Sequence, residues 1–137
     1  MKHLASIPAL ILLTTGLVMA QTPATTTEKV VEHHIQSGND RNVEAVMEDY
    51  ADDAILIAPG GIVHKGKQAI RGSFEELVAQ GDGPVVIPDQ KVYEGEVGYV
   101  VWTMNAGPAA IHGTDTFIVK NGKIVVQTVT IFQPTGE

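Results

Sequence analysis

A single carboxylate, Asp115, interrupts a segment that otherwise alternates like a half-buried β-strand. The segment runs from Gly113 to Val119 and leads through an Asn-Gly pair at 121–122, a typical hairpin turn, into a second strand. Side chains two positions apart share a strand face, so Asp115 lies on the same face as Phe117. A carboxylate on an apolar face is costly unless it is paired or used, and burial raises its pKa. Asp115 is therefore a candidate proton or hydrogen-bond donor, unless Phe117 faces solvent and Asp115 lies on the surface.

The neighbouring strands add further side chains to the Asp115 face. A hairpin about residues 106–107 places Gly98, Val100, Trp102 and Met104 on this face. The residues predicted to contact a substrate are Trp102, Met104, Phe117, Gln127, Val129, Ile131 and, as a core residue rather than a catalytic phenol, Tyr50. Such a mainly apolar set with few polar groups is typical of a small-molecule pocket. Apart from Asp115 and Gln127, it is equally typical of a core beneath a sheet.

Helical periods come first in the chain and strand periods follow. A first helix is predicted over 30–38, and a second begins after Asp40, its predicted cap, and runs to Tyr50. A third is predicted over 67–80. Its inward-facing residues are Ile70, Phe74, Leu77 and Val78. Strands are predicted over 54–59, 62–64, 85–93, 97–104, 109–119 and 124–132. This order predicts an α+β fold, a cone-shaped curved antiparallel sheet packed against three N-terminal helices.

The N-terminus has the features of a signal peptide. Lys2 is followed by an apolar stretch, and small residues at Val18 and Ala20 fit cleavage after Ala20. We therefore expect residues 1–20 to be a signal peptide, 21–27 a polar linker and 28–137 a single domain, exported to the periplasm or the medium. Without cysteine, the chain can form neither disulfides nor a lipoprotein anchor.

The charge balance is acidic and excludes several classes of partner. The chain has 9 Lys and Arg against 16 Asp and Glu, and removal of residues 1–20 takes away one basic residue. This balance argues against nucleic acid and, after signal cleavage, against membrane surfaces. Because the five histidines show no HxH or HExxH spacing, neither a metal site nor a cofactor is expected. A small apolar molecule is the expected partner.

Three short motifs, in order, resemble a known superfamily. They are Tyr-Ala-Asp-Asp-Ala at 50–54, Gly-Lys-Gln-Ala-Ile-Arg at 66–71, and Asp-Thr-Phe at 115–117 before Asn-Gly-Lys-Ile at 121–124. Together they are similar to the nuclear-transport-factor-2-like superfamily, which includes ketosteroid isomerases and SnoaL-like polyketide cyclases. The resemblance spans nearly the whole chain after the signal peptide. It implies a homodimer through the outer sheet face, where Tyr99, Val101, Thr114, Thr116, Thr128 and Thr130 form a flat surface with little charge.

The resemblance also assigns roles to individual positions. Asp115 matches the neutral aspartic acid with which ketosteroid isomerases donate to a developing oxyanion. The general base of those enzymes falls on Ala58, which cannot abstract a proton, and their oxyanion-hole tyrosine falls on His34. Steroid isomerisation by that mechanism is therefore not expected.

What remains is a pair, His34 as base and Asp115 as acid, within hydrogen-bond or one-water reach in one cavity. Such a pair suits an isomerase, lyase or hydrolase acting on an apolar, carbonyl-bearing compound. The alternative is a non-catalytic ligand-binding or interaction domain, in which His34 only satisfies Asp115.

Overall fold

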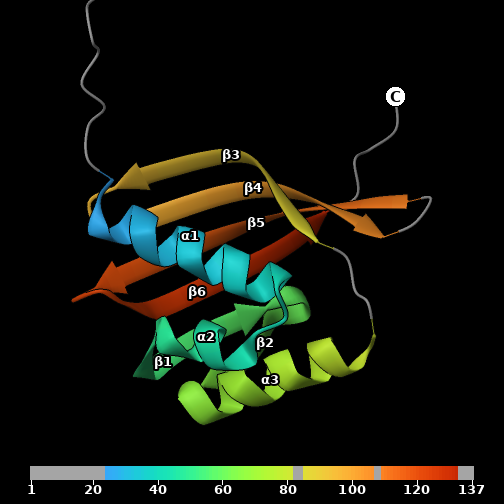
Figure 1. Ribbon diagram of the computed structural model, residues 1–137, viewed down its shortest axis with the longest axis horizontal. Coiled ribbons are helices and arrows are strands. Elements are labelled where there is room, and N and C mark those ends of the chain that lie inside the picture. Colours follow the sequence, from blue (N-terminus) through green and yellow to red (C-terminus); the bar gives the residue numbers. More distant parts are fainter. Residues whose placement is uncertain (1–23, 82–84, 107–108, 133–137) are drawn as a thin grey trace, which may run out of the picture.

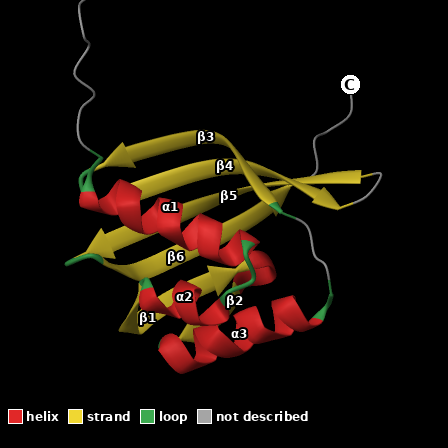
Figure 2. Cartoon of the chain, viewed as in Figure 1, coloured by secondary structure: helices red, strands yellow, loops and turns green. Residues whose placement is uncertain are grey.

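The computed structural model describes residues 24–81, 85–106 and 109–132. Within them, three α-helices and six strands follow one another along the chain (Figure 1). The elements are α1 (Thr26–Asn39), α2 (Val43–Glu48), β1 (Tyr50–Ala58), the 3-10 turn η1 (Pro59–Gly61), β2 (Ile62–Lys65), α3 (Lys67–Ala79), β3 (Val86–Glu94), β4 (Val97–Ala106), β5 (Ala109–Lys120) and β6 (Lys123–Phe132). Figure 2 separates the helical layer, in red, from the sheet, in yellow.

The sheet has the strand order β2-β1-β6-β5-β4-β3. All neighbouring strands are antiparallel except β1 and β6, which run parallel. The predicted α+β fold with a curved sheet is confirmed, and the parallel pair is the one departure from a fully antiparallel sheet. Register shifts that mark bulges interrupt three of the strand pairs, at Tyr50/Ile55, Pro88/Gln90 and Ile118/Val119. Such bulges bend and twist strands, which is how a sheet curves around a cavity.

The first helix begins inside the segment predicted to be a linker. Thr25 caps α1, and its side-chain oxygen accepts the backbone N–H of Glu28 at 3.1 Å. Threonine followed three residues later by glutamate is the spacing of a capping box, a signal that the linker prediction overlooked. The linker prediction for 21–27 is therefore wrong for Thr26 and Thr27, which belong to the helix.

The second helix is shorter than its periodicity suggested. Asn42 caps it and accepts the N–H of Ala45 at 3.1 Å, whereas Asp40, the predicted cap, ends α1 instead. Arg41 separates the two helices with a left-handed backbone (φ +57°). Tyr50, predicted to lie on the helix, is the first residue of β1, where it pairs with Ile124 of β6.

The helices cover one side of the sheet and enclose the core. α1 lies along β3, β4 and β5, while α3 packs on β1 and β2 (Figure 1). The buried hydrophobic residues are Val31, Val46, Met47, Tyr50, Ala54, Leu56, Ile70, Val100, Trp102, Phe117, Val119 and Ile124. On α3, Ile70 is fully buried as predicted, but Leu77 is 55% exposed. The end of α3 thus stands away from the core and leaves room beneath it.

The strand register agrees with the predicted sheet faces. Val100 of β4 lies opposite Asp115 of β5, which in turn lies opposite Val129 of β6. Asp115, Trp102 and Gln127 therefore share the face that α1 covers. The opposite face carries Tyr99 and the predicted threonines, and the dimer through it stays a prediction.

The signal peptide prediction falls on residues 1–20, outside the described residues, so export also stays a prediction. Among the helices that the structure describes, none is long and apolar enough to cross a membrane.

The end of α1 is tied to β3 by Asn39. Its amide donates to Val86 O and accepts from Val86 N, both at 2.9 Å. We expect Asn39→Ala to destabilise the fold by roughly 1–3 kcal/mol, because the Val86 backbone groups lose their partners. Denaturant unfolding measures this, with Gln36→Ala, which removes an exposed bond to Asp40, as the control. Equal losses of unfolding free energy in the two variants would contradict a stabilising role for the Asn39–Val86 hydrogen bonds.

Candidate functional site

A cavity of about 380 Å³ lies between the helices and the sheet. It is lined from both layers by His34, Ile35, Gly38, Asn39, Arg41, Val43, Val46, Leu56, Ala58, Pro59, Ser73, Phe74, Leu77, Val78, Val86, Trp102, Met104, Asp115, Gln127, Val129 and Ile131. Most of these side chains are apolar, as is usual for a small-molecule pocket.

Most residues predicted for the site do line this cavity. His34 and Asp115 face the same space, and Trp102, Met104, Gln127, Val129 and Ile131 join them. Tyr50 and Phe117 are fully buried and are not among the lining residues, so they support the site from the core. Ala58 also lines the cavity, so no carboxylate is available at that position.

Asp115 is held from two sides. Its Oδ1 accepts a hydrogen bond from the indole Nε1 of Trp102, and its Oδ2 accepts one from the amide Nε2 of Gln127, both at 2.9 Å. Gln127 is fixed in turn, because its Oε1 accepts the hydroxyl of Tyr50. Three strands thus converge on one carboxylate. Among the hydrogen bonds of the described residues, none joins Asp115 to His34 directly, and reach through one water stays a prediction.

Gly113 makes the Trp102 contact possible. The two residues lie opposite each other in the β4–β5 pair. A Cβ on Gly113 would sit 2.2 Å from Cζ2 of Trp102 and 2.6 Å from the Thr130 carbonyl oxygen. The indole therefore lies directly over the glycine. A glycine inside a strand is a recognised sign of such a close approach, and it could have been read from the sequence.

The protonation of Asp115 follows from its surroundings. Burial raises the pKa of Asp115 to about 6, although the hydrogen bonds from Trp102 and Gln127 act in the opposite direction. Most Asp115 side chains are therefore ionised at pH 7. A carboxylate with a pKa close to the working pH is a competent general base. At pH 7 Asp115 is thus suited to accept a proton, while the acid role, which needs its protonated form, stays a prediction.

His34 is 5% exposed and is packed edge-on against Tyr50, Phe74 and Phe117. Burial lowers its pKa to about 4, and the charge of neighbouring His33 acts in the same direction. The ring is therefore neutral at pH 7, and its basicity is low. Since Nδ1 is buried, a ligand can reach only Nε2 among the ring nitrogens. His34 is thus suited to hydrogen bonding, and its role as a base stays a prediction.

The other polar side chains of the lining are mostly occupied. Asn39 binds the Val86 backbone, and the Ser73 hydroxyl donates to Ile70 O at 2.7 Å. Arg41 is the only lysine or arginine among the lining residues, and the sequence analysis missed it. Its Nη1 donates to Val78 O and Gly81 O at the end of α3, which places a positive charge at the cavity wall.

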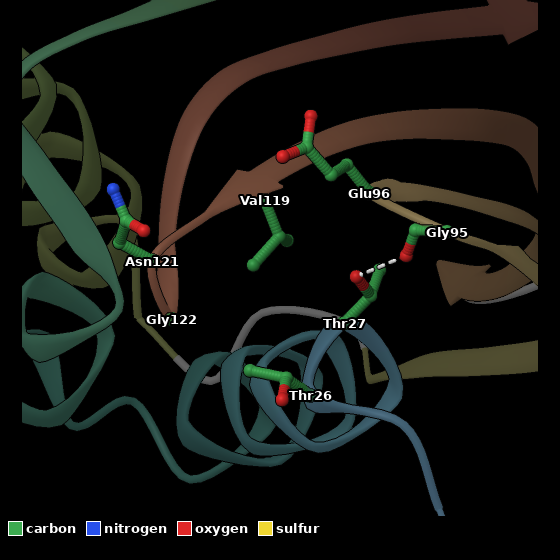
Figure 3. Close-up of a pocket in the computed structure, with 7 residues that line it drawn as sticks. All are labelled: Thr26, Thr27, Gly95, Glu96, Val119, Asn121 and Gly122. Carbon is green, nitrogen blue, oxygen red and sulfur yellow. Dashed lines mark hydrogen bonds between the residues drawn. The ribbon is translucent and has the colours of Figure 1, made fainter.

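A second hollow, of about 310 Å³, lies at the other end of α1 (Figure 3). Thr26, Thr27, Gly95, Glu96, Val119, Asn121 and Gly122 line it. The Thr27 hydroxyl is already used, since it donates to Gly95 O at 2.7 Å. Glu96, the one ionisable side chain, points away from the threonines (Figure 3). The polar side chains that could act on a ligand therefore lie around the larger cavity. In the described part of the chain, no group of three potential metal ligands converges anywhere.

Comparison with known proteins identifies the family of the chain. The sequence profile of the SnoaL-like domain matches residues 31–127, which include every titratable group of the cavity. The chain belongs to the SnoaL-like domain family. The resemblance to the nuclear-transport-factor-2-like superfamily is thereby confirmed. No curated protein sequence matches the chain.

Solved structures show that the SnoaL-like fold is shared widely. An NTF2-like protein of unknown function from Burkholderia xenovorans matches with a TM-score of 0.72 and 18% identity, over 82% of this chain and 87% of that one. A Kribbella flavida protein provisionally named a ketosteroid isomerase matches with a TM-score of 0.74 and 16% identity, over 82% of each chain. A provisionally named polyketide cyclase from Sinorhizobium meliloti reaches 0.66 and 20%, over 74% of this chain and 93% of that one. At these identities the likeness extends to the fold alone.

Gly113→Ala tests whether the Trp102 indole packs directly against residue 113. We expect a loss of roughly 1–3 kcal/mol from overpacking, together with a red shift of tryptophan fluorescence as the ring leaves Asp115. Trp102 is the only tryptophan, so the emission reports on this site alone. Gly72→Ala on α3 is the matched control, since its Cβ would meet nothing within 4 Å. It should gain about 0.5–1 kcal/mol from helix propensity. An unchanged emission in Gly113→Ala would contradict the arrangement.

Asp115 and His34 should influence stability with opposite signs. The pKa of Asp115 rises from 3.8 to about 6 on folding, so between these values the folded state holds the proton more tightly and stability falls as pH rises. The pKa of His34 falls from 6.5 to about 4, so its contribution makes stability rise over nearly the same range.

Substitution of either residue should reveal the pH dependence of stability that the other contributes between pH 4 and 6. Relative to the wild type, the unfolding free energy of Asp115→Asn should increase with pH by roughly 1 kcal/mol per unit, and that of His34→Gln should decrease similarly. Denaturant titrations at several pH values in this window measure both slopes. Slopes equal to that of the wild type would show that neither pKa is displaced.

Proposed function

We propose that this SnoaL-like domain binds an apolar, carbonyl-bearing small molecule and transfers a proton on it, with Asp115 as the base. The observation that carries the proposal is the Asp115 carboxylate, which faces an apolar cavity and is aimed by Trp102 and Gln127. Perturbed carboxylates in clefts are frequent at catalytic sites.

The cavity offers the parts that enolisation requires. The ionised Asp115 takes a proton from the carbon next to the substrate carbonyl. Arg41 is the cationic group of the lining that can offset the negative charge developing on the carbonyl oxygen. The protonated Asp115 then returns the proton to the same carbon, which gives exchange, or, where a β,γ double bond extends the enolate into a dienolate, to the γ-carbon, which shifts the double bond into conjugation. The apolar walls strengthen these interactions because they lower the local dielectric constant.

Size and polarity constrain the ligand. A volume of about 380 Å³ suits a molecule of one to three small rings. Pro59, Leu77 and Ile131 make the lining apolar where it is exposed to solvent. The proposed ligand is therefore apolar over most of its surface, with its polar atoms directed to Asp115, His34 and Arg41.

Hydrogen–deuterium exchange tests the proposed base directly. The probe is 2-tetralone, an apolar bicyclic ketone with exchangeable hydrogens next to its carbonyl. We expect the wild type to accelerate deuterium uptake from D₂O, with a rate that rises with pH through about 6 as Asp115 ionises. Asp115→Asn should lose roughly 10²- to 10⁴-fold of the enzymatic rate. Mass spectrometry or NMR of the ketone measures the exchange.

A matched control removes a carboxylate outside the cavity. The Asp52 side chain is 99% exposed, so Asp52→Asn should leave the exchange rate unchanged. Binding is followed separately through the fluorescence of Trp102, the single tryptophan. If 2-tetralone changes this fluorescence but does not exchange, the proton-transfer proposal fails and the chain is a ligand-binding domain.

A further inference from the structure

A line of three ionisable side chains leads from the surface to the cavity. His33 and His34 are consecutive on α1, yet their side chains are 48% and 7% exposed. Between them lies Asp49, whose side chain is 9% exposed and which ends α2. Neither His33 nor Asp49 has a spacing that marks it in the sequence as part of a site.

The Asp49 carboxylate is fixed in place. Nδ1 of His33 lies 2.8 Å from Oδ1 and 2.9 Å from Oδ2, so one ring N–H bridges both oxygens. The backbone is held as well, because Asp49 N donates to Val46 O and Ile124 N donates to Asp49 O at 2.7 Å. Burial raises the pKa of Asp49, whereas the hydrogen bond from His33 and the charge of Lys123 lower it.

His34 faces this carboxylate with a nitrogen that has no partner. Its Nδ1 is buried without a hydrogen bond in the described residues, and it lies 3.9 Å from Oδ2 of Asp49. Since the ring is neutral at pH 7, this approach is a contact between a dipole and a charge rather than an ion pair. A neutral imidazole carries its proton on one nitrogen only. A proton on Nε2 would leave the Nδ1 lone pair facing the negative oxygen, whereas a proton on Nδ1 points a positive N–H at it.

We propose that Asp49 is a positioning residue that keeps the proton of His34 on Nδ1 and so leaves the lone pair of Nε2 for the cavity. Electrostatics at this separation favours that tautomer by on the order of tenfold. Asp49 acts through His34 and does not line the cavity. His33 takes part by holding the carboxylate in line.

The tautomer narrows the class of ligand, and this step rests on the proposed function. With Nε2 as an acceptor and Asp115 ionised, the two titratable groups of the cavity both accept hydrogen bonds. The group that meets His34 must therefore carry a hydrogen, as a hydroxyl or an enol does and a bare carbonyl oxygen does not. An apolar ketone with a nearby hydroxyl, or its enol, fits this pattern, with its carbonyl oxygen left to Arg41.

Nitrogen-15 NMR of the ligand-free protein tests the tautomer without any assay of activity. Long-range proton–nitrogen correlations of the imidazole rings distinguish a protonated from an unprotonated ring nitrogen. We expect the wild type at pH 7 to show His34 protonated on Nδ1. In Asp49→Asn, the unprotonated fraction of Nδ1 should increase by about tenfold. Asp52→Asn removes an exposed carboxylate and should leave the tautomer unchanged.

Two results would overturn the proposal. One is a wild-type His34 protonated on Nε2, which is measurable even if Asp49→Asn does not fold. The other is a folded Asp49→Asn variant with the wild-type tautomer. Either result leaves the exchange assay with Asp115→Asn unaffected, so the two proposals fail separately.

Discussion

The structure depends on the burial of one carboxylate beside an apolar cavity. An ionised group there is tolerated only if its oxygens receive hydrogen bonds, and Asp115 receives them from Trp102 and Gln127. Because these donors come from β4 and β6, the carboxylate is satisfied only when three strands are in the correct register. The requirement extends outward, since Gln127 needs the Tyr50 hydroxyl and Trp102 needs the space above Gly113. The need to satisfy the Asp115 carboxylate thus favours one register of β4, β5 and β6.

The same surroundings assign different protonation states to the two titratable groups of the cavity. Burial disfavours charge on both, but Asp115 keeps part of its ionisation through two donors, whereas the Nδ1 of His34 has no partner. At neutral pH the cavity therefore holds one negative carboxylate and one neutral ring, with the charge of Arg41 nearby. Such a site distinguishes ligands by where their hydrogens lie as much as by their shape.

The sequence predicted those features that follow from local periodicity. Alternation along the strands placed Asp115, Trp102 and Gln127 on one face, because hairpin register propagates from turns that are visible in the sequence. Helical spacing likewise turned His34 inward. The parallel pairing of β1 with β6 could not be predicted, since it joins segments about seventy residues apart, such as Tyr50 and Ile124. The raised pKa of Asp115 could be predicted from its strand face, whereas the lowered pKa of His34 could not, because it depends on burial among aromatic rings from other elements.

The position of β6 has a consequence for how the chain reaches its native state. Although β6 is the last of the six described strands, it lies in the interior of the sheet, between β1 and β5. It supplies the edge with which β1 pairs and the Gln127 oxygen that accepts the Tyr50 hydroxyl. β6 therefore joins the β1–β2 hairpin to the rest of the sheet, and its pairing with β1 closes a long loop at a cost in chain entropy. The cavity therefore needs β6 to be complete, and shortening the chain into this strand would separate the two halves of the sheet.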